Sequence, residues 1–193
     1  MATVFDTPDF TTKHPLKSAW TFWVDIPDKS QKMSQKDWQD NLRRIYTVDS
    51  VEDFWGVFNN LQAASELPLS ANYHLFRGDI KPAWEDPRNT KGGKWAFQFK
   101  NRRTDLDGLW QQAALGAIGE CFPHAECVCG IVVSIRKGVD RVSVWTANSE
   151  KASCMSIGQQ FKTLLNVDER VGFQTHESAA VKRSSTTAEK FSC

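Results

Sequence analysis

Aromatic and acidic side chains stand next to one another at several points of this chain, which holds eight Trp among its 193 residues. Trp23 is the single aromatic residue on the otherwise polar face of an alternating segment, and Trp145 lies on the polar face of another. Trp84 is followed directly by Glu85 in a loop punctuated by proline. An indole stacks on a flat cation while a neighbouring carboxylate accepts hydrogen bonds from the cation's edge. We therefore expect a planar, positively charged ligand.

Basic residues are placed so that they could hold an anionic extension of the same ligand. Arg136 and Arg141 flank one predicted hairpin turn, and Lys94 is expected to face outward from its strand. The chain has 24 Lys and Arg against 23 Asp and Glu, a formal net charge of +1. This balance argues against a protein that binds long nucleic acid through a large positive surface, so any basic site must be local.

The elements that would position these residues follow from the apolar spacing. Alternation with a period of two predicts strands near residues 20–26, 42–48, 73–77, 94–100, 128–136, 141–146 and 171–174. Helical spacing predicts three helices, one capped by Ser50, one capped by Thr104 together with Asp107, and one over about 150–166. We expect an α+β fold in which three amphipathic helices pack on the convex face of a curved antiparallel sheet. The ligand slot then lies on the concave face.

The domain organisation expected is a mobile N-terminal arm over residues 1–13 and a single domain over residues 14–193. No run of 18 or more apolar residues and no apolar N-terminal segment is present, so we expect neither a membrane span nor a secretory signal.

Cysteine chemistry is the main alternative to a binding function. The odd number of five Cys favours reduced thiols and a cytoplasmic location, or also a nuclear one. A zinc site would need Cys121, His124, Cys127 and Cys129, whose spacing fits no common zinc motif. A thiol hydrolase built on Cys121 and His124 lacks a third group that could be placed from the sequence. We therefore expect no metal, no cofactor and no enzymatic activity.

Several short runs identify a family. They are His14-Pro15-Leu16, Trp20-x-x-Trp23, the run from Thr47 to Trp55, Tyr73-x-Leu75-Phe76, Pro82-x-Trp84-Glu85-Asp86, Gly92-Gly93-Lys94-Trp95 and Trp145-Thr146. With these runs the chain resembles eukaryotic translation initiation factor 4E, the family that binds the 5' cap of messenger RNA. The resemblance extends from about His14 to Phe191.

The resemblance implies roles for the residues above. Trp23 and Trp84 would sandwich the 7-methylguanine base, Glu85 would accept hydrogen bonds from its N1 and N2 edge, and Trp145 would lie near the N7-methyl group. Arg136 and Arg141 would contact the phosphates, and Lys94 would make a peripheral or water-mediated contact with them. The function implied is recruitment of messenger RNA for translation initiation.

The resemblance also implies a partner surface on the helix-covered side of a monomeric protein. It would bind a helical Tyr-x-x-x-x-Leu-apolar peptide of a 4G-type scaffold or of a 4E-binding repressor protein. The matching residues are His14, Pro15, Val51, Trp55 and Leu115. Gln111 and Gln112 depart from the residues usual in the family and leave the choice of partner open.

Other readings remain open at this point. Ser185 matches a regulatory phosphorylation site of the family. A cap-binding homologue that represses translation, or that is specialised for a modified cap, would share the same residues. Outside RNA, aromatic walls beside a carboxylate would also suit a reader of methylated lysine.

Overall fold

A computed structural model describes residues 12–27, 41–99, 103–178 and 189–193. Their strands form one antiparallel sheet in the order β2-β1-β3-β5-β6-β4-β7-β8. The strands are β1 (Pro15–Asp25), β2 (Leu42–Ser50), β3 (Asn72–Arg77), β4 (Gly93–Phe99), β5 (Val128–Ser134), β6 (Asp140–Thr146), β7 (Gly172–Thr175) and β8 (Phe191–Ser192). The helices are α2 (Val51–Phe58), α3 (Arg103–Ile118) and α4 (Lys151–Leu165), with 3-10 turns η1 (Ala64–Glu66) and η2 (Ala125–Cys127).

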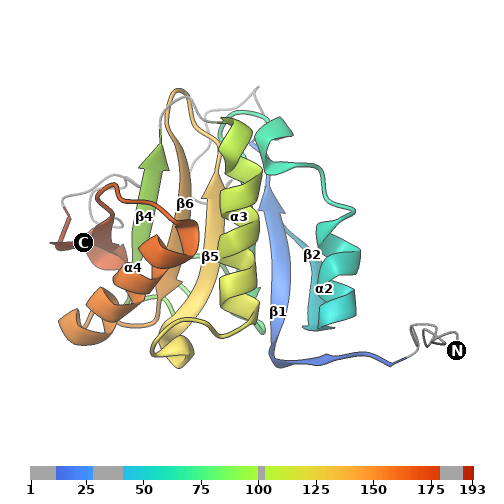
Figure 1. The fold of residues 1–193 in the computed structure, drawn as a ribbon, viewed down its shortest axis with the longest axis horizontal. Helices are drawn as coiled ribbons and strands as arrows, with labels where there is room; N and C mark the ends of the chain where they lie inside the picture. Colours follow the sequence, from blue (N-terminus) through green and yellow to red (C-terminus); the bar gives the residue numbers. More distant parts are fainter. Residues whose placement is uncertain (1–11, 28–40, 100–102, 179–188) are drawn as a thin grey trace, which may run out of the picture.

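The three helices lie on the same face of the sheet, with α3 across its middle, α4 toward β4 and α2 beside β2 (Figure 1). The prediction of an α+β fold with a curved antiparallel sheet and three helices on one face is confirmed. None of the helices in the described ranges combines the length and the apolar character that crossing a lipid bilayer requires.

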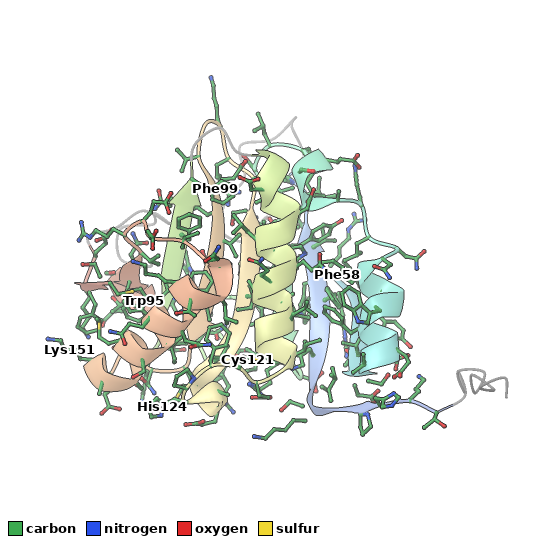
Figure 2. The ribbon with its side chains drawn as sticks, in the orientation of Figure 1. Phe58, Trp95, Phe99, Cys121, His124 and Lys151 are labelled. Atoms are coloured by element: carbon green, nitrogen blue, oxygen red, sulfur yellow. The ribbon has the colours of Figure 1, made fainter. Side chains whose placement is uncertain are left out.

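The main core fills the layer between helices and sheet, because alternate strand residues turn their apolar side chains to this side. Figure 2 shows Phe58, Trp95 and Phe99 in this layer. Trp95 is fully buried, and its indole nitrogen donates a hydrogen bond of 2.9 Å to the Cys154 carbonyl of α4. This bond satisfies a polar group in the core and ties α4 to the sheet.

Helix capping agrees with the sequence prediction at one helix and not at the other. The Ser50 hydroxyl accepts a hydrogen bond of 3.2 Å from the Asp53 backbone N–H, as predicted for the N-cap of α2. The predicted cap at Thr104 is wrong, because α3 begins at Arg103 and Thr104 lies inside it. The Asp107 carboxylate instead accepts hydrogen bonds from the backbone and the hydroxyl of Ser65, which fastens η1 to α3.

All predicted strands are present, and the structure adds a further strand, β8, near the end of the chain. β8 pairs with β7 at the sheet edge, where Phe191 stacks on Phe173 with ring centroids 5.6 Å apart. The sequence predicted no strand after residues 171–174. Ser185 lies outside the described residues, as do residues 1–11 of the predicted N-terminal arm.

Candidate ligand-binding site

The face of the sheet that the helices leave open carries polar and aromatic side chains in register on adjacent strands. On β3, β5 and β6, Asn72 pairs with Ser134 and Ser134 with Arg141. Two residues further along β3, His74 pairs with Val132, and Val132 pairs with Ser143. Lys94 of β4 pairs with Trp145 of β6. Since every second residue of a strand points to the same face, these side chains converge.

A cavity of about 190 Å³ lies over these rows. Its lining is Asn72, His74, Trp84, Lys94, Val132, Ser134, Arg136, Arg141, Ser143 and Trp145. Trp84 is the contribution of the loop between β3 and β4, and the others come from the strands or their ends. The structure thus brings together five of the residues predicted for the ligand: two indoles and three cations.

The aromatic end of the cavity is built on Trp145. Its ring meets Phe76 edge-on with centroids 5.4 Å apart, and the His176 ring lies 4.1 Å away. Trp145 is only 7% exposed, so it is a fixed part of the cavity wall rather than a freely standing plate. Burial and nearby Lys94 lower the pKa of His176 to about 3, so the ring behind Trp145 is neutral at physiological pH.

The basic end contains Arg136, Arg141 and Lys94. Lys94 points to the open face of the sheet, as predicted, and lines the cavity, where it is buried and only 7% exposed. Burial lowers the pKa of Lys94 to about 7, with further lowering by Arg141 and Arg136. Burial also lowers the pKa of Arg136 and of Arg141. Three crowded, partly desolvated cations are stabilised by any anion that enters.

Trp23 and Glu85 line a different hollow. They border a groove of about 550 Å³ with Leu42, Lys81, Ala83, Asp86 and Pro87. Trp23 lies on the predicted face, since it pairs with His74, and it packs against the cluster that contains Phe76 and Trp145. Its indole nitrogen is buried without a hydrogen-bond partner in the described part of the chain. The structure therefore does not place Trp23 and Trp84 in one cavity.

The loop of residues 81–87 borders both hollows, the cavity through Trp84 and the groove through Glu85 and its neighbours. The Asp86 carboxylate shapes it by accepting hydrogen bonds of 2.9 Å from the backbone N–H groups of Lys81 and Arg88. The Asn89 amide donates to the carbonyls of Lys81 and Ala83. These bonds hold the base of the loop, so Trp84 and Glu85 project from a defined turn.

The predicted partner residues gather on the opposite side, where β1 begins and α2 starts. The Val51 backbone N–H donates to the His14 carbonyl at 2.9 Å, and the His14 ring is 2.6 Å from the Glu52 carboxylate. Trp55 is half-buried and contacts Phe54 and Phe58 edge-on. The Pro15 backbone pairs with Ser50, and Leu115 lies on α3 of the same face.

The sequence interpretation missed the polar residues on the cavity floor, namely Asn72, His74, Ser134 and Ser143. Period-two spacing could have found Asn72 and His74, since both alternate with the core residues Tyr73 and Leu75. Their proximity to Arg136 depends on the pairing of β3 with β5, which is not readable from local spacing.

The fold and the site together define a class of protein. It is a binding domain built on one sheet, with helices packed on one face and a cavity lined by indoles and cations on the other. The chain belongs to the eukaryotic initiation factor 4E family, whose family model matches residues 15–191. The family consists of initiation factors and not of enzymes, as the sequence predicted.

Individual relatives cover most of the chain. Eukaryotic translation initiation factor 4E-1 of Phaseolus vulgaris is 42% identical over 167 residues, which is 86% of this chain and 71% of the relative. A solved complex of C. elegans eIF4E-3 with the 4E-binding protein Mextli and a cap analog matches with a TM-score of 0.84 at 30% identity, over 94% of this chain and 100% of that chain. Ascaris suum eIF4E-3, solved with the m2,2,7G cap and with the m7G cap, matches with a TM-score of 0.83 at 36% identity, over 94% of this chain and 98% of that chain.

Proposed function

We propose that this protein binds the 7-methylguanosine 5' cap of messenger RNA and acts in translation initiation. The observation that carries the proposal is the cavity that joins Trp84 and Trp145 to Arg136, Arg141 and Lys94. A cap has the matching parts, a flat cationic base joined to a chain of phosphates. Relatives solved with cap analogs share the fold and support the assignment.

The base is recognised by stacking and by its charge. Trp84 supplies one stacking surface and Trp145 the wall near the methyl group. Methylation at N7 makes the base a cation, so each indole gains a cation–π attraction of about 0.5–2 kcal/mol. Glu85, on the same loop as Trp84, accepts hydrogen bonds from the N1 and N2 edge, and these bonds are strengthened by charge. GTP lacks the positive charge and therefore binds more weakly.

The phosphates are held by Arg136 and Arg141, with Lys94 behind them. Because Lys94 is buried beside two guanidinium groups, phosphates also relieve the repulsion among the three cations. This makes Lys94 a central contributor to phosphate binding, in contrast to the peripheral contact expected from the sequence.

The second stacking surface was predicted to be Trp23, which borders the adjoining groove together with Glu85. Trp38 lies outside the described residues and precedes Leu42, a lining residue of the same groove, by a few positions. Either indole could then form the second stacking surface. A parallel comparison of Trp23→Ala and Trp38→Ala tells which of the two does. The stacking residue is the one whose loss lowers affinity for 7-methyl-GTP while the melting temperature is retained.

A partner peptide would bind on the helix-covered side through His14, Pro15, Val51, Trp55 and Leu115. The half-exposed Val51 and the half-buried Trp55 lie along α2 there and offer an apolar anchor for a helical Tyr-x-x-x-x-Leu-apolar segment. The complex of a relative with a 4E-binding protein supports this assignment. All five cysteines are free thiols, which fits a reducing compartment such as the cytoplasm.

Isothermal titration calorimetry with 7-methyl-GTP and with GTP tests the proposal. We expect 7-methyl-GTP to bind much more tightly, and Glu85→Ala to lose retention on a cap resin while the protein stays folded. Glu169→Ala, which removes an exposed acid that lines neither hollow, is the matched control. Equal affinity for the two nucleotides would refute cap recognition. Displacement of 7-methyl-GTP by a trimethyl-lysine peptide would favour a reader of methylated lysine.

The same titration with a 2,2,7-trimethylated cap examines the modified-cap alternative, which the complex of the Ascaris suum relative motivates. Two added methyl groups on N2 remove the N2–H donor, so Glu85 would accept a hydrogen bond from N1–H alone. We therefore expect weaker binding than for the 7-methyl cap, and tighter binding would identify a specialised homologue.

A further inference from the structure

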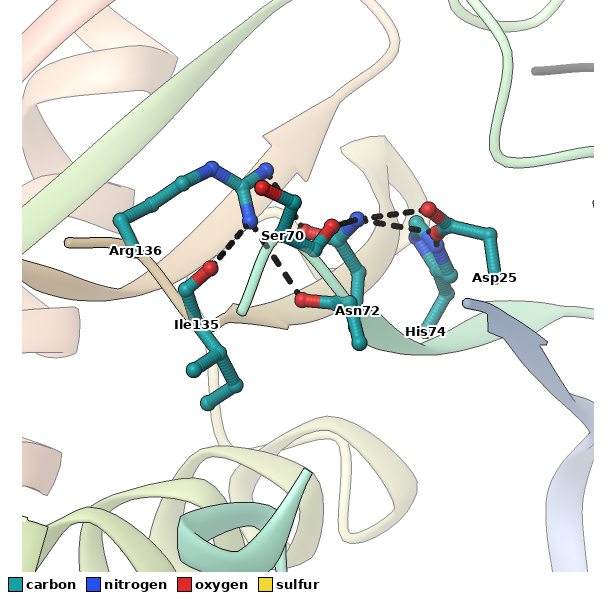
Figure 3. A network of polar contacts seen from close by, with 7 residues as sticks. Asp25, Ser70, Asn72, His74, Ile135 and Arg136 are labelled. Carbon is teal, nitrogen blue, oxygen red and sulfur yellow. Dashed lines mark hydrogen bonds and ion pairs between the residues drawn. The ribbon is translucent and has the colours of Figure 1, made fainter. Parts of the chain in front are cut away.

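A chain of polar contacts extends from Arg136 into the sheet, through residues that the proposed function does not use (Figure 3). The Arg136 guanidinium donates a hydrogen bond of 2.9 Å from Nη2 to Oδ1 of Asn72. Nδ2 of Asn72 donates to both carboxylate oxygens of Asp25, at 2.8 and 3.0 Å. The His74 ring nitrogen Nε2 lies 2.6 Å from Asp25 Oδ1. The chain thus joins β1, β3 and the end of β5.

These residues are buried, so their contacts are costly to break. Asp25 is 1% exposed, His74 3% and Asn72 5%. A carboxylate withdrawn from water to this degree is tolerated when hydrogen-bond donors surround it. Asn72 and His74 both point at Asp25, which makes Asp25 the fixed centre of the group.

The position of Asn72 between Asp25 and Arg136 leaves its amide one orientation. An ionised carboxylate only accepts hydrogen bonds and a guanidinium only donates them. The Asn72 NH₂ must therefore face Asp25, and its oxygen must face Arg136. A residue without both a donor and an acceptor cannot join these two groups.

Arg136 is held on several sides. Its Nη1 donates to the Ile135 carbonyl at 2.8 Å and to the Ala71 carbonyl at 3.4 Å. Asp140 accepts the Arg136 backbone N–H at 2.9 Å. Burial and Arg141 lower the pKa of Arg136, whereas Asp25 and Asp140 act to raise it. Asp25 is therefore also a counter-charge for the guanidinium.

We propose that Asn72, itself fixed by the buried Asp25–His74 pair, is a positioning residue that holds Arg136 ready for the phosphates of the ligand. The inference rests on the proposed function and deepens it. Arginine has many rotamers, and ordering a side chain on binding lowers affinity. A guanidinium that is already fixed in the free protein avoids this loss. Asn72 then contributes only when the ligand carries phosphates that reach Arg136.

The test uses calorimetry with 7-methylguanosine and with 7-methyl-GTP. Asn72→Ala should weaken 7-methyl-GTP binding by about 2- to 10-fold, the factor that corresponds to ordering one long side chain. Binding of the nucleoside should be unchanged, because it has no phosphates. Glu169→Ala, which removes an exposed acid that lines neither hollow, should leave the ratio of the two affinities as in the wild type.

A double-mutant cycle separates positioning from general damage. In an Arg136→Ala background, Asn72→Ala should cause no further loss, since Asn72 acts through Arg136. Equal losses with and without Arg136, or equal losses for nucleoside and triphosphate, would overturn the inference. Failure of the wild-type protein to bind 7-methyl-GTP would overturn the proposed function instead.

An exchange variant tests the same idea in case Asn72→Ala does not fold. Asn72→Asp alone places two carboxylates side by side and should weaken 7-methyl-GTP binding. The double variant Asp25→Asn/Asn72→Asp restores one carboxylate and one amide, in exchanged places, and leaves an acceptor facing Arg136. We expect it to recover affinity relative to Asn72→Asp. No recovery, with both variants folded by circular dichroism, would contradict the proposed arrangement.

Discussion

Replacement of Trp84 is the most direct test of how the cavity recognises a base. Trp84 is half-buried, comes from a loop and belongs only to the edge of the small aromatic cluster around Phe76. Trp84→Ala should therefore leave the melting temperature almost unchanged while removing a stacking surface. A base–aromatic stack contributes about 1–3 kcal/mol, and the cation–π attraction adds about 0.5–2 kcal/mol. Together these predict a loss of roughly 10- to several-thousand-fold in affinity for 7-methyl-GTP.

The discrimination between nucleotides gives a second readout of the same variant. GTP loses only the stacking part, so the preference for 7-methyl-GTP should fall by about 2- to 30-fold, the factor for the cation–π attraction. Calorimetry is the assay, because it does not depend on the fluorescence of the removed residue. Trp84→Phe, which keeps an aromatic plate, is the control and should retain most of the affinity. Wild-type affinity and discrimination in Trp84→Ala would refute the stacking argument.

Three further predictions concern the basic end, the partner surface and the helix cap. The pKa of Lys94 is lowered to about 7 from 10.5. Between these two pH values the unfolded chain therefore binds more protons than the native protein. The free energy of unfolding consequently rises with pH in this window. Bound phosphates favour the charged ammonium, so 7-methyl-GTP affinity should fall over the same window. Lys94→Met should reduce both trends in melts and titrations at about pH 6 and 8.5, and identical pH profiles in the two proteins would disprove the role of Lys94. Trp55→Ala should reduce affinity for a Tyr-x-x-x-x-Leu-apolar peptide by at least about 30-fold, a loss of 2 kcal/mol or more, with cap binding intact; a peptide titration with unchanged affinity would count against this surface. Ser50→Ala should lower the free energy of unfolding by about 1 kcal/mol in urea, since it removes the N-cap of α2, and an unaltered midpoint would show that the cap is replaced.

The site shows where sequence reasoning succeeded and where it stopped. Alternation on single strands correctly assigned Trp145, Arg141 and Trp23 to the open face of the sheet, because side-chain direction is a local property of a strand. Alternation does not tell how deeply a side chain is buried on the face to which it points. Lys94 alternates onto the open face as an exposed residue would, yet it is only 7% exposed, in a strand that β6 and β7 flank on both sides.

The amino-acid sequence by itself determined the family, the faces of the strands, the cap of α2 and the residue types of a site for a flat cation with an anionic chain. These depend on contacts within a few residues, or on motifs that stay recognisable along the chain. The tertiary structure alone decided which of those residues share a cavity. The order β1-β3-β5 joins strands that are not consecutive in the chain. Only that pairing brings Asn72 and Asp25 to Arg136, and it leaves Trp23 beside the cavity rather than in it.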